Sequence, residues 1–254
     1  MSLEGRHAVV TGGSRGIGEA IAIALAAAGA HVSLIGRNRE KLEQVAEALR
    51  IAHAGRKFAA IVADVADSAA ARRGVEAARQ QGGPIDVLIN NAGQAASAPF
   101  LQTDEALWQR MLSVNLNSAY FCTQAALPDM LGAGFGRVVN VASIAGLRGA
   151  PYISAYVASK HAMVGLTRAL ATEVSAKGIT VNAVCPGYTD TDIVRTAVRS
   201  IAEKTKRPPE EARAALAAMN SLGRLIRPEE VAHTVAWLCG PEATGITGQA
   251  IELT

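Results

Sequence analysis

The chain has 254 residues, enough for one α/β domain around a single sheet, and its composition of 50% hydrophobic and 19% charged residues excludes intrinsic disorder. The net charge of +3 comes from 25 basic and 22 acidic residues spread along the chain, which argues against a nucleic-acid partner. The three cysteines and five histidines show no ligand spacing, so we expect no metal. Neither a secretion leader nor an apolar run of membrane-spanning length is evident, so we expect a cytoplasmic protein with no membrane partner.

Short runs rich in β-branched residues alternate with Ala-rich segments of helical period along most of the chain. The runs are apolar throughout, which is typical of a parallel sheet covered by helices on both faces. We therefore predict a single doubly wound α/β domain over residues 1–254. The predicted strands span residues 7–12, 31–36, 57–65, 86–93, 137–143, 179–187 and 249–253, and the helices between them include 18–29, 39–53, 104–131 and 152–176.

Between residues 190 and 222 this alternation stops. The insert is rich in Arg and Ala, has a helical pattern and contains Pro208-Pro209. We predict that it forms a helical lid over a substrate site. The helix after it is expected to begin at Pro228 and to end before Gly240, because proline favours the first helical turn and glycine the C-terminal end.

A glycine-rich turn, TGGSRGIG at residues 11–18, joins the first predicted strand to the first predicted helix. Exposed backbone N–H groups and the helix dipole at such a junction favour a bound phosphate, and glycine permits its close approach. A turn of this kind can also be a tight connection and nothing more. Its glycines, Gly12, Gly16 and Gly18, are spaced differently from the G-x-G-x-x-G of larger dinucleotide-binding dehydrogenases.

Further motifs follow the turn in the chain. They are Asn90-Asn91-Ala92-Gly93, Asn115, Ser143, Tyr156-Val157-Ala158-Ser159-Lys160, and Pro186-Gly187 followed by Thr191. Together with the turn, this order resembles the short-chain dehydrogenase/reductase family over nearly the whole chain, and most closely its β-ketoacyl thioester reductases, including polyketide ketoreductases. The resemblance implies a Rossmann fold and an NAD(P)-dependent oxidoreductase acting on CH–OH groups. A cofactor-binding protein without chemistry is the alternative, and the complete set of motifs argues against it.

The end of the second predicted strand bears on the choice of dinucleotide. NAD-selective sites carry an Asp or Glu there to hold the ribose 2′-hydroxyl, whereas a 2′-phosphate needs cations. That position is Gly36 here; Arg37 follows it, and Arg15 precedes the second glycine of the turn. Either arginine could simply be solvated. Two guanidinium groups beside a missing acid favour NADP(H), with NAD(H) as the alternative.

The resemblance implies the other cofactor contacts. Asp64 and Val65 would flank the adenine, although an Asp at a strand end is otherwise a capping or turn residue. Thr189 and Thr191 would meet the carboxamide and the pyrophosphate, and Thr191 could also start the lid helix through a capping box. The full expected set is Gly12, Ser14, Arg15, Gly16, Ile17, Gly18, Arg37, Asp64, Val65, Asn91, Ala92, Gly93, Tyr156, Lys160, Pro186, Gly187, Thr189 and Thr191.

Tyr156 and Lys160 are four residues apart, which places them on one face of a helix. A phenol has a pKa of ~10, so we expect the ammonium of Lys160 to lower it. The resemblance implies that Tyr156 is the catalytic acid/base and that Lys160 also binds the nicotinamide ribose. It further implies that Ser143 hydrogen-bonds the substrate oxygen and that Asn115 holds a water of the proton relay. Singly, these side chains could equally be a surface cation, a core hydroxyl and a helix-interior amide.

The expected reaction interconverts a ketone and a secondary alcohol, with a 3-oxoacyl thioester of acyl-carrier protein or CoA as the expected substrate. The insert also resembles that of 3-hydroxybutyrate dehydrogenases, which would use NAD(H). Ala145 and Ile153 stand where those enzymes carry a histidine and a lysine near the substrate. A free carboxylate would therefore lack its anchors, and an unpaired charge in a closing site is costly. An uncharged reacting end, in a thioester or an alicyclic ketone, is favoured.

The predicted helices at 104–131 and 152–176 carry more apolar residues than one sheet face needs. These residues are Trp108, Met111, Phe121, Met163, Val164 and Leu166. The family resemblance implies that such helices pair between subunits, so we expect a homotetramer, with a dimer as the alternative.

Overall fold

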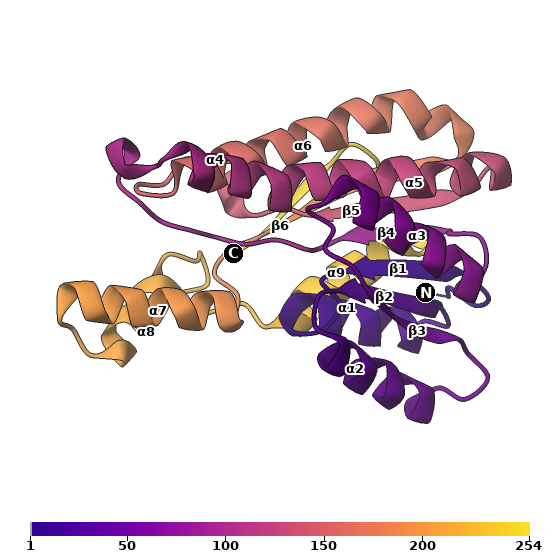
Figure 1. The fold of residues 1–254 in the computed structure, drawn as a ribbon, viewed down its shortest axis with the longest axis horizontal. Coiled ribbons are helices and arrows are strands. Elements are labelled where there is room, and N and C mark those ends of the chain that lie inside the picture. The colour runs from indigo at the N-terminus through magenta and orange to yellow at the C-terminus, as the bar shows by residue number, and fades with distance from the viewer. Residues whose placement is uncertain (1) are drawn as a thin grey trace.

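The computed structural model describes residues 2–254, and its seven strands form one parallel sheet in the order β3-β2-β1-β4-β5-β6-β7 (Figure 1). The order reverses between β1 and β4, and ligands bind in such sheets beyond the carboxyl ends of the strands at this switch point. The predicted doubly wound fold is confirmed. The strands are β1 His7–Thr11, β2 His31–Gly36, β3 Phe58–Val62, β4 Val87–Asn90, β5 Gly136–Val141, β6 Ile179–Pro186 and β7 Ala250–Leu253.

Two layers of helices cover the sheet. One layer holds α1, α2 and α9, and the other holds α3, α5 and α6 (Figure 1). No helix within residues 2–254 combines the length and the hydropathy needed to cross a membrane. The helices are α1 Gly16–Ala27, α2 Arg39–Ala52, α3 Ser68–Gly82, α4 Glu105–Leu112, α5 Ser118–Ala133, α6 Ser154–Val174, α7 Asp192–Thr205, α8 Pro209–Ala218 and α9 Pro228–Cys239.

The apolar strands are explained by burial on both faces of the sheet. On β1, Val9 packs into the core on the α3 and α5 side, and its neighbour Val10 packs into the core on the α1 and α9 side. On β4, Leu88 packs on the α3 and α5 side, and Ile89 packs on the α1 and α9 side. Because successive side chains point to opposite faces, both must be apolar when helices cover both faces.

The single helix predicted over residues 104–131 is wrong in one respect. The structure places a π-helical turn, Ser113–Asn117, between α4 and α5. The amide of Asn115, in the middle of this turn, bonds to the backbone of Gln94. Such π-turns are frequent at functional sites.

Three of the apolar residues assigned to subunit contacts belong to the core of the chain itself. Met111, Met163 and Val164 are 1%, 0% and 3% exposed, so their assignment is wrong. Met163 and Val164 pack in one core cluster with Ala119 of α5 and Cys185 of β6. Trp108 is 36% exposed, and Phe121 and Leu166 are half-buried. The homotetramer stays a prediction that rests on the last three.

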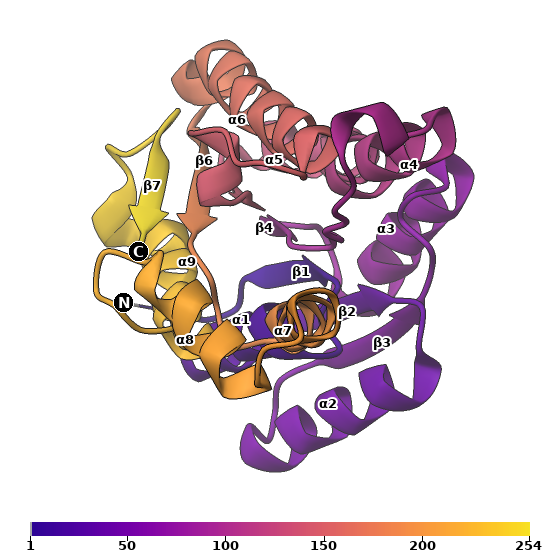
Figure 2. The ribbon, with the colours of Figure 1, turned by 90° about the vertical axis from the view of Figure 1, so that its left-hand side faces the viewer.

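The insert at 190–222 is helical, as predicted, and consists of α7 and α8. Val194 and Val198 of α7 pack on Ala212 and Leu216 of α8 in a small core separate from those of the sheet. The pair projects beyond the two main layers (Figures 1 and 2). We call residues 190–222 the lid segment.

Both ends of the lid segment are attached at one place. Thr189 forms an isolated parallel bridge with Ile226. The Asp190 N–H donates to the Ile226 carbonyl over 2.9 Å, and the Ile226 N–H donates to the Tyr188 carbonyl over 2.9 Å. The chain thus leaves and re-enters the domain close to the end of β6.

Candidate active site

The glycine-rich turn lies at the switch point of the sheet, between β1 and α1. Gly12 has a φ of +65°, a conformation that glycine adopts without strain. A Cβ on Gly18 would lie 2.2 Å from the Gly12 carbonyl oxygen, so only glycine fits there. Asn91 holds the turn from the end of β4, because its side-chain amide donates to the carbonyls of Thr11 and Gly12 over 2.9 and 3.2 Å. Thr11 Oγ1 accepts the N–H of Ala92 over 3.0 Å.

This turn fits a dinucleotide phosphate. Arg15 is the N-cap of α1, and no side chain caps the helix there. The first N–H groups of a helix have no partner within the helix, and they carry the positive end of its dipole. Gly16, Ile17 and Gly18 supply these N–H groups, and Ser14 lies beside them. The chemistry of the turn therefore suits an anion.

The two arginines assigned to the 2′-phosphate lie at the surface beside acids. Arg15 Nη1 is 2.9 Å from Asp192 Oδ2. Arg37, directly after β2, has its Nη1 3.9 Å from Asp64 Oδ2. Asp64 also accepts the N–H of Ala66 over 3.1 Å, which is the turn role considered for it, and the Val65 side chain is buried in the core. Both arginines are exposed and accessible to a ligand.

Three candidate catalytic side chains converge beyond β4 and β5. Lys160, on α6, is 3% exposed, and its Nζ donates to the Val141 carbonyl over 2.8 Å. A Cβ on Gly93 would lie 2.9 Å from Asn115 Oδ1 and 3.6 Å from Lys160 Nζ, so these residues line one space. Tyr156 lies one turn before Lys160 on α6, with the ammonium 5.9 Å from its ring centroid. The structure thus brings Asn115, Tyr156 and Lys160 together.

Ser143 comes to the same place from the end of β5. Its side chain caps a short 3₁₀ turn, Ile144–Gly146, by accepting the Ala145 N–H over 3.1 Å. It also shares a hydrogen bond with the Tyr156 side chain, which is the partner expected to deliver the proton. A serine and a tyrosine thirteen positions apart are adjacent here because β5 and the start of α6 meet at this edge of the sheet.

Burial controls the titration of the two central groups. Burial raises the pKa of Tyr156 above its usual value, and the hydrogen bond with Ser143 opposes this rise. We expected the Lys160 ammonium to lower this pKa; in the structure the ammonium donates to Val141, and the pKa of Tyr156 is raised on balance. Burial lowers the pKa of Lys160 to about 8, and the Cys185 thiol nearby acts against that shift. Desolvation thus favours the neutral form of each group.

The end of β6 supplies the remaining expected residues. The Gly187 N–H donates to the Leu253 carbonyl over 2.7 Å, directly after Pro186 ends β6. Thr189 and Thr191 are both buried. Thr191 is the N-cap of α7, but its hydroxyl donates to the Thr189 carbonyl over 3.2 Å and makes no capping bond, so the capping-box interpretation is wrong.

Two further residues contribute to the site and were not singled out from the sequence. Ser159 is fully buried; its hydroxyl donates to the Tyr156 carbonyl over 2.8 Å and accepts from the Asn115 amide over 3.2 Å. Its position between Tyr156 and Lys160 in the motif could have identified it. Gln94 exchanges two backbone hydrogen bonds with the Asn115 side chain, of 2.9 and 3.0 Å, and only its position next to Gly93 hinted at this.

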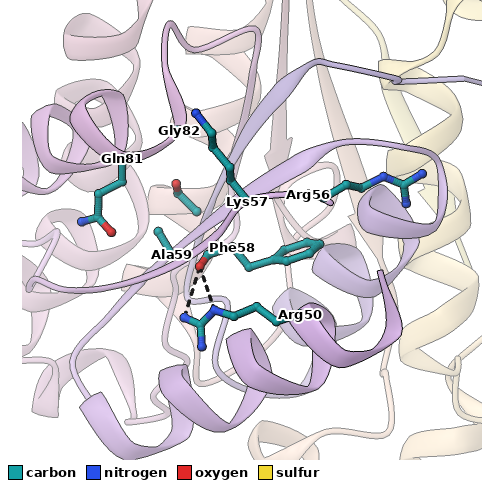
Figure 3. Close-up of a pocket in the computed structure, with 8 residues that line it drawn as sticks. Arg50, Arg56, Lys57, Phe58, Ala59, Gln81 and Gly82 are labelled. Atoms are coloured by element: carbon teal, nitrogen blue, oxygen red, sulfur yellow. Dashed lines mark hydrogen bonds between the residues drawn. The ribbon is translucent and has the colours of Figure 1, made fainter. Parts of the chain in front are cut away.

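A separate hollow of about 300 Å³ lies at the opposite end of the sheet (Figure 3). Arg50 crosses it to donate twice to the Phe58 carbonyl, over 3.2 and 3.3 Å (Figure 3). Arg50 is also paired with Glu47, and Arg56 with Glu4, so acids already compensate these cations. Two of the three cations that line the hollow are therefore already paired with acids, and the hollow shares no residue with the candidate active site.

The chain matches the short chain dehydrogenase family over residues 6–202. It is 37% identical over 251 residues to the 3-oxoacyl-[acyl-carrier-protein] reductase FabG of Pseudomonas aeruginosa, covering 99% of this chain and 96% of the relative. It is 40% identical over 244 residues to the cis-4-hydroxycyclohexanecarboxylate dehydrogenase of Sinomonas cyclohexanicum, covering 96% and 92%. A solved structure of an actinorhodin polyketide ketoreductase variant with NADPH is similar with a TM-score of 0.93 and 36% identity, covering 100% of this chain and 97% of that one.

Proposed function

The chain belongs to the short chain dehydrogenase family and is an oxidoreductase, and we propose that it is an NADP(H)-dependent ketoreductase that interconverts a 3-oxoacyl thioester and its 3-hydroxyacyl form. The observation that carries this proposal is the convergence of Asn115, Lys160 and Gly93 beside Tyr156, at the switch point that also holds the phosphate-binding turn. A reductase and a polyketide ketoreductase among its relatives support the same reaction class.

Bound NADPH supplies the hydride for the carbonyl carbon. Tyr156 then delivers its phenolic proton to the carbonyl oxygen, and the Ser143 hydroxyl stabilises the charge that develops on that oxygen. Lys160 has N–H groups beyond the one that Val141 accepts, and these would hold the ribose of the cofactor. Asn115 and Ser159 keep α6 and the π-turn in register, so that Tyr156 stays aligned.

The raised pKa of Tyr156 suits the reductive direction. A phenol whose pKa is raised keeps its proton at neutral pH, and reduction needs this acid form. Oxidation of the alcohol needs the phenolate instead. At neutral pH, Tyr156 is therefore in the protonated form that reduction uses.

The surroundings of Ser143 favour an uncharged reacting end. Ala145 is buried and Ile153 is half-buried. Both side chains are apolar, so neither can anchor a carboxylate. Arg148, which follows the 3₁₀ turn, is already paired with Glu252. An alicyclic ketone is the second candidate, because the 40% identical dehydrogenase of Sinomonas cyclohexanicum is named for cis-4-hydroxycyclohexanecarboxylate, in which the ring alcohol is separate from the carboxylate.

The test is a screen of NADPH oxidation against acetoacetyl-CoA, small acyclic ketones and cyclic ketones, followed at the absorbance of NADPH. We expect the highest kcat/KM for acetoacetyl-CoA. A preference for cyclic ketones would transfer the proposal to the second candidate. Tight NADPH binding without turnover on any member of the panel would instead point to a cofactor-binding protein without chemistry.

Arg37→Asp and Arg15→Ala are expected to weaken NADPH binding far more than NADH binding. Each substitution removes one charge-assisted partner of the 2′-phosphate, which corresponds to a loss of about 10- to 100-fold in NADPH affinity. Titration of each variant with both cofactors measures the ratio. A wild type that prefers NADH, with a ratio that neither variant shifts, would show the assignment of both arginines to be wrong.

A further inference from the structure

Arg15 and Asp192 join the phosphate-binding turn to the lid segment. Their side chains meet at 2.9 Å, although 177 residues separate them in the chain. The start of α7 packs on the same turn, since a Cβ on Gly16 would lie 3.3 Å from the methyl carbon of Thr191. The first residues of the lid helix therefore rest on the residues that precede α1.

Asp192 also belongs to a series of side chains of alternating charge in the lid segment. Arg195 lies 3.2 Å from Asp192 and 3.8 Å from Asp190, and Arg213 lies 2.8 Å from Asp190. Three arginines thus share two carboxylates, which leaves one positive charge without compensation. Arg15, in the phosphate-binding turn, is the member of this series nearest to the expected cofactor site.

The 2′-phosphate of NADP(H) would approach the same guanidinium group. A phosphate carries more charge than a carboxylate and accepts two parallel N–H bonds from an arginine. The Arg15–Asp192 pair is exposed, with side chains 59% and 48% accessible, and such pairs are weak and screened by salt. Two anions at one guanidinium also repel each other, so each weakens the binding of the other.

We propose that Asp192 is a cofactor-specificity residue that competes with the 2′-phosphate for Arg15. This proposal rests on the NADP(H) assignment above. Asp192 lowers the affinity for NADP(H) and leaves the affinity for NAD(H) unchanged. Because coupling between two binding events is reciprocal, NADP(H) in turn weakens the Arg15–Asp192 pair, whereas NAD(H) leaves it intact.

The test is Asp192→Asn, which keeps the shape of the side chain and removes its charge. Titration of the protein with NADPH and NADH, followed by the fluorescence of the reduced nicotinamide, is expected to show a gain of about 2- to 5-fold for NADPH and no change for NADH. Asp190→Asn is the matched control, since Asp190 pairs with Arg195 and Arg213 and not with Arg15. It is expected to leave both affinities unchanged.

A double-mutant cycle tests whether Asp192 affects NADPH binding through Arg15. In an Arg15→Ala background, Asp192→Asn is expected to have no further effect on NADPH affinity, because the shared partner is gone. Hydrogen exchange over residues 192–205 is expected to be faster with NADPH than with NADH in the wild type, and equal with both in Asp192→Asn. Unchanged or weaker NADPH binding by Asp192→Asn, or an effect that persists without Arg15, overturns the proposal. If Arg15→Ala itself fails to weaken NADPH binding, the cofactor assignment of Arg15 has failed rather than the role of Asp192.

Discussion

Tyr156→Phe is expected to lower turnover about 10²- to 10⁴-fold, the usual contribution of a positioned general acid, while the NADPH dissociation constant stays nearly unchanged. The substitution keeps the ring and removes the proton that reaches the carbonyl oxygen. The ring of Tyr156 is kept and the other expected cofactor contacts, Lys160 and the phosphate turn among them, are untouched, so binding is expected to change little. Single-turnover kinetics with a deuterated cofactor, together with an NADPH titration, separate the chemical step from binding.

The pH profile of the wild type provides a second view of the same residue. Since burial raises the pKa of Tyr156, its acid form persists into alkaline solution, and a fall of kcat for reduction near pH 8 is expected to reflect Lys160, whose pKa burial lowers to about 8, rather than Tyr156. The oxidative direction is expected to rise over the same range. Near-normal turnover of Tyr156→Phe, with the chemical step shown to be rate-limiting by an isotope effect, would require another proton donor.

Lys160→Met is expected to impair turnover and cofactor binding together. The ammonium is the buried cation of the site, and the loss of a charged hydrogen bond to the ribose corresponds to about 10- to 100-fold in NADPH affinity. Turnover is expected to fall by at least the same factor, because Lys160 is the expected neighbour of both Tyr156 and the nicotinamide ribose. A variant that loses turnover but binds NADPH normally would show that Lys160 does not contact the cofactor.

Without cofactor, the same variant is expected to be more stable than the wild type at pH 7. Burial lowers the pKa of Lys160 to about 8 in the folded chain, so the folded state carries a charge it disfavours, on the order of 3 kcal/mol. The loss of the bond to Val141 offsets about 1–3 kcal/mol of this. Between pH 8 and about 10.5 the unfolded chain binds the proton that the folded chain has released, so wild-type stability rises there and the advantage of Lys160→Met shrinks.

Denaturant unfolding of both proteins at pH 7 and pH 10 measures this difference. Lys177→Met is a suitable control, because Lys177 lies in an exposed turn at the end of α6. Its effect on stability is expected to be small and the same at both values. A Lys160→Met advantage that does not shrink with pH would show that packing, rather than the buried charge, is its source.

Sequence reasoning was reliable where the information is local. The period of the apolar residues indicates which segments are strands buried on both faces, and a short motif such as that from Tyr156 to Lys160 places its members on one helix face. The turn at residues 11–18 and the strand ends were located for the same reason. Three of the six apolar residues assigned to subunit contacts were assigned wrongly, because period alone does not show what covers a face; Met111, Met163 and Val164 are covered by the chain itself.

The sequence by itself determined the parallel α/β fold and the helical character of residues 190–222, because both follow from local spacing, and it supplied the proposed residues of the candidate site through their motifs. Only the tertiary structure decided how those residues behave. The π-turn at Asn115, the burial that raises the pKa of Tyr156 and lowers that of Lys160, and the pairing of Arg15 with Asp192 all depend on segments distant in the chain. Desolvation and ion pairing act through space, and the neighbours that cause them are set when the sheet and its helices pack together.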